Sequence, residues 1–222
     1  MTVQEQAIRT TGAWAALAAL IALLTGGTSL AMLGASAASS AAATSASPFF
    51  ALLGAAALAA ISLFDMFTVP ALHATLRSRG PALILVATGL ALVGDMLGIV
   101  GRLTQYAAAG SAISGLSPDV SSALDLLEHT VNTGGFLIVS VSFASFGVLF
   151  WRYGVRWLGL IAIATGVLTG LGQVPALGVL FMGANAGFIA WYVGLFLHFR
   201  RTGGRTVPDD EVEGARVLSP SG

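Results

Sequence analysis

The chain contains six stretches of about 20 predominantly apolar residues, separated by short polar or small-residue segments. A helix of that length crosses the hydrocarbon core of a bilayer, where every backbone polar group must be paired within the protein. Only 9% of the residues are charged, whereas roughly a quarter are charged in a soluble domain. The sequence therefore predicts an all-α, polytopic transmembrane bundle of six helices. The expected spans are Ala13–Leu33, Phe49–Leu72, Ala82–Gly101, Asn132–Trp151, Trp157–Val179 and Phe181–Phe199.

These six spans leave room only for short segments outside the membrane. Residues 1–12 are expected to form a cytoplasmic N-terminus, residues 13–199 the membrane domain, and residues 200–222 a disordered cytoplasmic tail. The alanine- and serine-rich run Ala35–Ser47 is expected to be a flexible extracytoplasmic connector. A second polar loop is predicted over Arg102–Pro118.

The distribution of arginine predicts the orientation of the bundle. With spans that alternate in direction, nine of the ten arginines fall on one side, and Arg102 alone falls on the other. Cytoplasmic loops retain positive charge, so both termini are expected in the cytoplasm.

The first apolar stretch has a second interpretation. Arg9, the apolar run and Ala35-Ser36-Ala37 together have the parts of a signal peptide and its cleavage site. However, a signal peptide has an apolar core of about 7–15 residues, and Ala13–Leu33 is longer. A retained span is favoured; if the segment is cleaved, five spans remain and the N-terminus lies outside.

Two acidic residues lie within the predicted spans, where charge is costly and therefore marks candidate sites. Asp65 is predicted about 7 Å from the cytoplasmic end of its span and Asp95 about 9 Å from the outer end of its own, so the two are not expected to share a proton directly. Asp65 is either functional or a structural group bonded to Thr68 or to a neighbouring helix. Asp95 is expected to pair with Arg102, seven residues further along the same helical face. Tyr192, near the middle of the sixth span, needs a hydrogen-bond partner and is expected to face the interior.

A polar layer is predicted at the extracytoplasmic ends of the helices. Ser117-Pro118-Asp119 predicts a helix start about three turns before the fourth span. Asp125, Glu128, His129 and Asn132 then share one helical face. This layer is either a pocket that opens outward or a polar surface that faces headgroups and water. The predicted ligand-binding residues are Asp95, Arg102, Asp125, Glu128, His129 and Gln173.

No catalytic residue, metal or cofactor is predicted. His73 and His198 are interpreted as parts of the positive cytoplasmic flanks rather than as haem ligands. The chain has no cysteine, which excludes disulfides and cysteine-ligated clusters, and its formal charge of zero gives no footprint for nucleic acid.

Several motifs resemble a known family. Asp65 is followed by Val69-Pro70-Ala71-Leu72, and Phe146-Gly147 leads to Leu149-Phe150-Trp151-Arg152 and then Trp157-Leu158-Gly159. With these motifs, the chain from Phe49 onward resembles a bacterial family of small six-span membrane proteins classified as a domain of unknown function. The resemblance implies six helices and the bacterial cytoplasmic (inner) membrane, and it implies no activity or site residues.

The function expected from these features is to bind or move a small polar solute or a proton through the outward-facing pocket. One alternative is a non-catalytic membrane module that modulates a partner protein. Another is an intramembrane enzyme or metal site that uses Asp125, Glu128 and His129. An enzyme is the less favoured class, because this spacing is a weak signal. The lipid bilayer is an expected partner, and a homo-oligomer or a membrane partner protein is compatible with the sequence.

Overall fold

The computed structural model describes residues 3–32, 48–114 and 117–203. Six long helices make up nearly all of this part, and it contains no strand. The predicted connector Ala35–Ser47 and the tail from residue 204 onward lie outside the described residues. The long helices are α1 (Val3–Met32), α3 (Pro48–Leu76), α4 (Pro81–Ile113), α5 (Pro118–Tyr153), α6 (Arg156–Gly172) and α7 (Leu180–Gly203), and the short 3₁₀ turns are η1 (Arg77–Arg79) and η2 (Pro175–Leu177).

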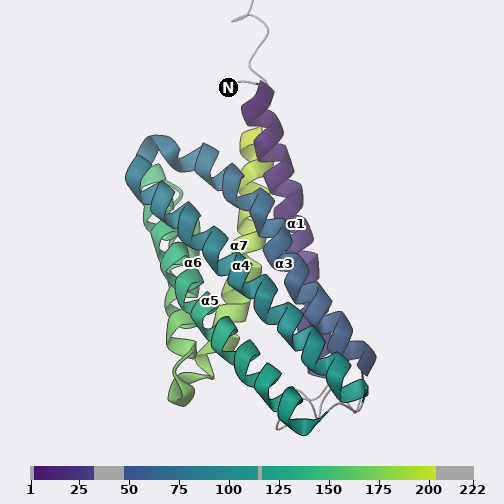
Figure 1. Cartoon of the computed structure of the whole chain (residues 1–222). Coiled ribbons are helices and arrows are strands. Elements are labelled where there is room, and N and C mark those ends of the chain that lie inside the picture. The colour runs from purple at the N-terminus through teal and green to yellow at the C-terminus, as the bar shows by residue number, and fades with distance from the viewer. Residues whose placement is uncertain (1–2, 33–47, 115–116, 204–222) are drawn as a thin grey trace, which may run out of the picture.

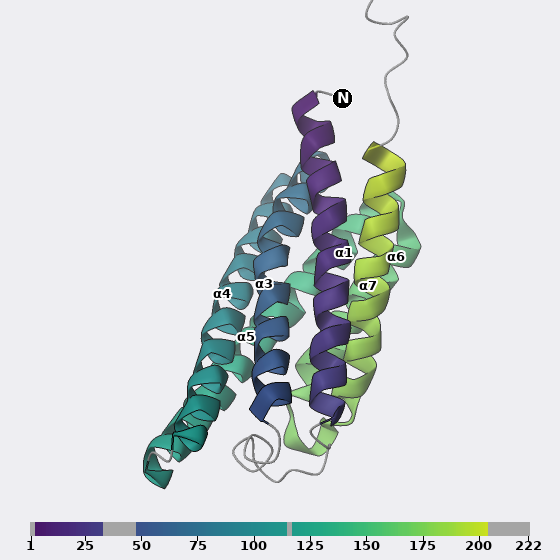
Figure 2. The same cartoon turned by 90° about the vertical axis from the view of Figure 1, so that its right-hand side faces the viewer.

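The six helices form a closed ring. Each long helix packs against the next one along the chain, and α7 packs against α1. Successive helices run in opposite directions, so the start of α1 and the end of α7 lie at the same end of the bundle (Figures 1 and 2). The prediction of an all-α helical bundle is confirmed.

Five of these helices are long and apolar enough to cross a membrane, namely all except α6. The apolar part of α6, Arg156–Leu171, is shorter. The described chain therefore has the architecture of a multi-pass membrane protein.

Several helices extend beyond the predicted spans. The prediction of a polar loop over Arg102–Pro118 is wrong, because α4 continues as a helix to Ile113. Residues 101–113 contain no proline and only two glycines, Gly101 and Gly110, which are too few to end the helix. By contrast, α6 ends at Gly172, before the predicted end at Val179, because Pro175 cannot continue a helix and begins η2 instead.

Local capping signals fix both ends of α5. The Ser117 side chain accepts a hydrogen bond from the backbone N–H of Asp119, with Pro118 in the first turn, as the sequence predicted. At the other end, Gly154 adopts φ 92°, a left-handed conformation that glycine reaches without a steric penalty. The turn at Gly154 lets α6 fold back along α5.

Glycines sit where neighbouring helices cross. A Cβ atom on Gly159 of α6 would lie 2.7 Å from the carbonyl oxygen of Gly147 on α5. Likewise, a Cβ atom on Gly94 of α4 would lie 2.5 Å from Cγ2 of Val139 and 3.4 Å from the carbonyl oxygen of Gly135. Small residues allow helices in lipid to approach closely, because packing supplies much of their association energy. Gly94 therefore allows α5 to approach α4 closely.

The most tightly packed part of the ring lies toward the end where α1 begins. There the alanines of α1 let α3 and α7 come close on either side, and large side chains fill the space between the other helices. Fully buried residues of this core include Leu76, Ile84, Leu149, Phe150, Leu158, Leu195 and Phe199. Packing loosens away from this core, and there the ring encloses a cavity.

Candidate functional site

A cavity of about 460 Å³ lies inside the ring, and its lining residues come from α1, α3, α4, α5 and α7. Most of the lining side chains are aliphatic or aromatic. Ligand-binding pockets commonly combine such walls with a few polar groups, within a volume of roughly 300–1,000 Å³. The polar lining residues are Thr28, Ser62, Asp65, Thr68, Asp95, Arg102, Asn132, Ser142, Asn185 and Tyr192.

Asp65 and Tyr192 connect two helices across the interior. The Tyr192 hydroxyl group donates a hydrogen bond of 2.6 Å to Oδ2 of Asp65. The side chain of Tyr192 is buried. Its partner, Asp65, is the residue that the sequence analysis left as either a functional or a structural group. The expectation that Tyr192 faces the interior and has a partner is confirmed. Thr68 bonds instead to the backbone oxygen of Phe64 in its own helix.

Asp95 lines the same cavity and is 8% exposed. Among the described residues, it makes no hydrogen bond and no ion pair. Asp65 lines the same cavity from α3. The sequence placed these two carboxyl groups at separate depths, yet both line one cavity. Because α4 continues about three turns past its predicted end, that end was not a valid mark for the depth of Asp95.

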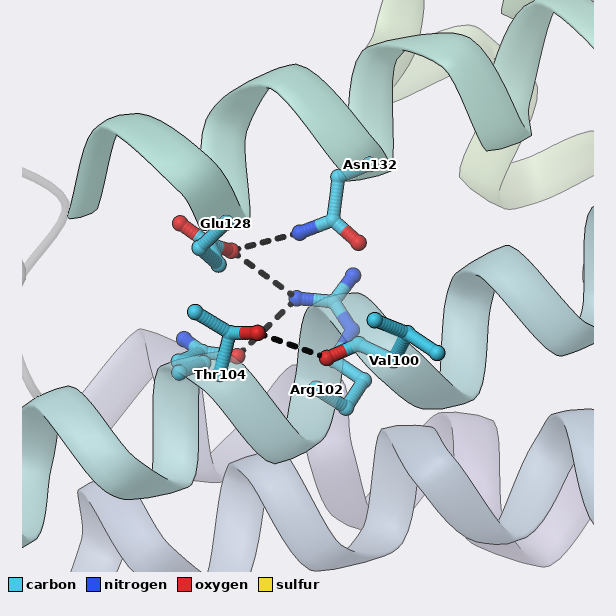
Figure 3. Close-up of polar contacts among 6 residues, drawn as sticks. Val100, Arg102, Thr104, Glu128 and Asn132 are labelled. Atoms are coloured by element: carbon cyan, nitrogen blue, oxygen red, sulfur yellow. Dashed lines mark hydrogen bonds and ion pairs between the residues drawn. The ribbon is translucent and has the colours of Figure 1, made fainter. Parts of the chain in front are cut away.

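Arg102 has a different partner from the one predicted. Its Nη1 lies 3.8 Å from Oε1 of Glu128 on α5 and donates a 3.0 Å hydrogen bond to Oε1 of Gln105. The Arg102 and Glu128 side chains are only 16% and 18% exposed. The expected pairing of Arg102 with Asp95 is therefore replaced by an ion pair between α4 and α5 (Figure 3).

Asn132 completes this polar group. Its Nδ2 donates a hydrogen bond to Oε1 of Glu128, and its side chain lies against Gly101, which has no side chain to obstruct it. Figure 3 shows Asn132 and Arg102 approaching the same carboxylate from opposite helices. Glu128 therefore neutralises the charge of Arg102 and holds the guanidinium group beside the cavity.

The remaining predicted site residues lie elsewhere. Asp125 and His129 are near enough to Glu128 to act on its charge, but neither lines the cavity. Gln173 donates a hydrogen bond to the backbone oxygen of Thr169 in α6, a helix that contributes nothing to the lining. The described residues include no group of three or more histidines and carboxylates that could hold a metal ion.

Aromatic rings form one wall of the cavity, between α5 and α7. Phe143 contacts both Phe188 and Trp191, with ring centroids 5.2 Å apart in each pair. Nearer the start of α7, the centroids of Phe136 and Phe181 are 5.0 Å apart. These edge-on and tilted contacts hold the rings in place. All five residues line the cavity.

His198 lies at the opposite end of the bundle from Arg102 and does not belong to the cavity. It is buried between the rings of Phe150, Tyr153 and Phe199. Arg200 and Arg201 follow it in the sequence, so His198 lies in the arginine-rich segment that the sequence analysis assigned to it. His73 lies 3.3 Å from the Thr88 hydroxyl group, through Nδ1, on the neighbouring helix.

No protein-family model, curated protein or solved structure matches this chain.

The aromatic wall was missed by the sequence reasoning. Phe136, Phe143 and Phe188 look like ordinary lipid-facing residues in an apolar span. A usable signal was present: Phe136 and Phe143 are seven residues apart, as are Phe181 and Phe188. Residues seven apart share one face of a helix, so each pair predicts an aromatic face.

Proposed function

We propose that this protein binds a small solute inside its helical ring and that Asp95 holds either the solute or a proton. The observation that carries the proposal is the Asp95 carboxyl group, which is buried in an apolar cavity and has no partner among the described residues. A polar group in hydrocarbon is costly unless it is neutralised or bonded. Asp95 is therefore satisfied either by a proton or by a ligand that supplies hydrogen-bond donors or charge.

The surroundings of Asp95 support a binding site more strongly than a structural role. A structural carboxyl group is normally bonded within the protein, as Asp65 is to Tyr192. The nearby cation, Arg102, is already paired with Glu128. The cavity also has enough volume for a drug-sized molecule.

We further propose that the chain crosses a membrane six times with both termini in the cytoplasm. Six antiparallel helices support the number of crossings, and α6, with 17 residues, is about 25 Å long. The described arginines at the end where α1 begins support the orientation. They are Arg9, Arg77, Arg79, Arg152, Arg156, Arg200 and Arg201, whereas Arg102 lies toward the other end.

In this orientation Arg102, Asn132 and Asn185 line the extracytoplasmic side of the cavity. Asn185 is exposed, which supports an opening on that side. The resemblance to the bacterial six-span family also remains a proposal, and with it the bacterial inner membrane as the location.

Two measurements on purified protein test the proposed function. In detergent, the melting temperature is measured with a panel of neutral, anionic and cationic small solutes, for the wild type, Asp95→Asn and Asp119→Asn. Asp119 is an exposed carboxylate at the start of α5, outside the cavity. In liposomes that contain a pH-sensitive dye, proton movement is followed after a membrane potential is imposed.

We expect that at least one solute stabilises the wild type and Asp119→Asn but not Asp95→Asn, or that the protein moves protons and Asp95→Asn does not. The proposal fails if no solute distinguishes Asp95→Asn from Asp119→Asn and no protein-dependent proton movement is found.

A further inference from the structure

The charges that line the cavity are unevenly balanced. Four ionisable residues line the cavity. Two are the carboxyl groups of Asp65 on α3 and Asp95 on α4, and the others are Arg102 on α4 and Tyr192 on α7. Glu128 of α5 lies 3.8 Å from Arg102 and neutralises it. The lining residues from α1 carry no ionisable group. The groups of the cavity without a charge partner are therefore the two carboxyls, which become negative when they lose a proton and then favour a cationic occupant over an anionic one.

Asp95 is also the group to which an occupant can bind. It is more than nine-tenths buried, lines the cavity and has no partner among the described residues. Asp65 already accepts a hydrogen bond from Tyr192. A positively charged occupant would satisfy Asp95 without displacing any existing bond.

The aromatic wall adds attraction for the same kind of charge. The faces of aromatic rings attract cations, most strongly where water is excluded. Phe143, Phe188 and Trp191 line the same cavity as the two carboxyl groups. In the described part of the chain, arginine stacks on Tyr153, Trp151 and Phe196, none of which lines the cavity. The cavity rings are therefore not occupied by a cation of the protein itself.

From these three observations we propose that the ligand is a lipophilic organic cation, which binds among the aromatic rings and exchanges for a proton on the cavity carboxyls. This inference rests on the proposed function and specifies its substrate class. The aliphatic and aromatic lining binds the apolar body of the cation, and Asp95 binds its charge. When the cation binds, the proton leaves Asp95 for water, and the charge of the cavity stays constant.

The exchange predicts that protons and cations compete. The ionisable groups that face Asp95 are Asp65 from α3, Tyr192 from α7, and Arg102 with Glu128 at the junction of α4 and α5. Arg102 and Glu128 form an ion pair with each other, and Tyr192 donates a hydrogen bond to Asp65. The two carboxyls therefore carry the exchange, and a permanent cation binds more tightly as the pH rises.

A pair of isosteric probes with opposite charge tests this proposal in the full-length protein. Binding of tetraphenylphosphonium and of tetraphenylborate is measured by equilibrium dialysis in detergent at pH 6 and pH 8. The proteins compared are the wild type, Asp95→Asn, Asp65→Asn and the matched control Asp119→Asn. The comparison of the two probes uses the wild type alone, so it holds even if a variant fails to fold.

We expect the phosphonium ion to bind the wild type and Asp119→Asn, more tightly at pH 8 than at pH 6. Asp95→Asn should weaken this binding by about tenfold or more, which corresponds to the loss of a single charge contact. Tetraphenylborate should bind at least tenfold more weakly than its cationic counterpart.

Equal or tighter binding of tetraphenylborate would overturn the cation assignment, as would an unchanged affinity in both Asp95→Asn and Asp65→Asn. Binding of neither probe, together with Asp95-dependent stabilisation by an anionic or neutral solute in the panel, would also overturn it while leaving the proposed function in place. Failure of the solute panel and of the proton measurement would instead remove the proposed function.

Discussion

The Tyr192 hydroxyl group donates a 2.6 Å hydrogen bond to Asp65, a residue 127 positions earlier in the chain. Their helices, α7 and α3, flank α1 on its two sides, so the bond crosses the interior of the ring behind α1. It lies beside the cavity, which both residues line. This contact therefore supports both the closure of the ring and the shape of the site.

Replacement of Tyr192 by Phe is expected to lower the free energy of unfolding by about 1 kcal/mol, because Asp65 loses its donor inside the bundle. The measurement is thermal unfolding in detergent. Tyr106→Phe is the matched control, since Tyr106 is half exposed and makes no described contact of its hydroxyl group. Equal effects of the two changes would contradict the importance of the bond.

The ion pair between Arg102 and Glu128 is expected to appear as coupling in a double-mutant cycle. Arg102→Gln and Glu128→Gln should each reduce stability, and the double variant should recover about 1 kcal/mol relative to the sum. The parallel cycle with Asp95→Asn should be close to additive, because Arg102 forms an ion pair with Glu128 and donates a hydrogen bond to Gln105 instead. The opposite result, with coupling to Asp95 alone, would show that the arginine is paired differently in solution.

The crossing of α5 and α6 is expected to tolerate no added methyl group. Gly159→Ala would place a Cβ atom 2.7 Å from a backbone oxygen of Gly147, and overpacking of this kind costs about 1–3 kcal/mol. Gly89→Ala serves as the control, because no atom lies within 4 Å of its added Cβ. Differential scanning of the two purified variants should show a lowered melting temperature for Gly159→Ala only.

The absence of cysteine from the chain makes the proposed orientation directly measurable. Single replacements at two exposed serines, Ser78→Cys and Ser114→Cys, place a thiol group at opposite ends of the bundle. A membrane-impermeant maleimide added to intact cells is expected to label Ser114→Cys and to label Ser78→Cys only after lysis. The reverse labelling pattern would invert the proposed topology.

Much of the fold follows from apolar stretch length, since a bilayer permits few alternatives to helices. The helix ends were less predictable. The polar residues of segment 102–113 led to the prediction of a loop, because loops are commonly polar. The segment is helical because it contains no proline and because α4 packs beside α5. In contrast, Pro175 in the sequence does indicate that α6 ends before the predicted residue Val179.

Of the six predicted ligand-binding residues, Asp95 and Arg102 line the cavity, and the pairing expected between them is not present. Asp65 and Asp95 stood out in the sequence because ionisable groups are rare in apolar spans, and both line the cavity. Which of them meet depends on rotation and tilt of the helices, which packing at glycines such as Gly94 and Gly135 determines. The depth of a residue estimated from the rise per residue along one helix contains no information on rotation or tilt. That estimate therefore separated two carboxyl groups that line the same cavity.

Closure of the ring by the last helix also orders the events of synthesis. α1 and α3 are made first, and Asp65 receives its tyrosine only when α7 is complete and packs against α1. A chain that stops before Leu180 presents this acid to lipid or to a neighbouring molecule, at a cost that the finished protein does not bear. Satisfaction of this acid inside the bundle thus depends on the last helix to be synthesised.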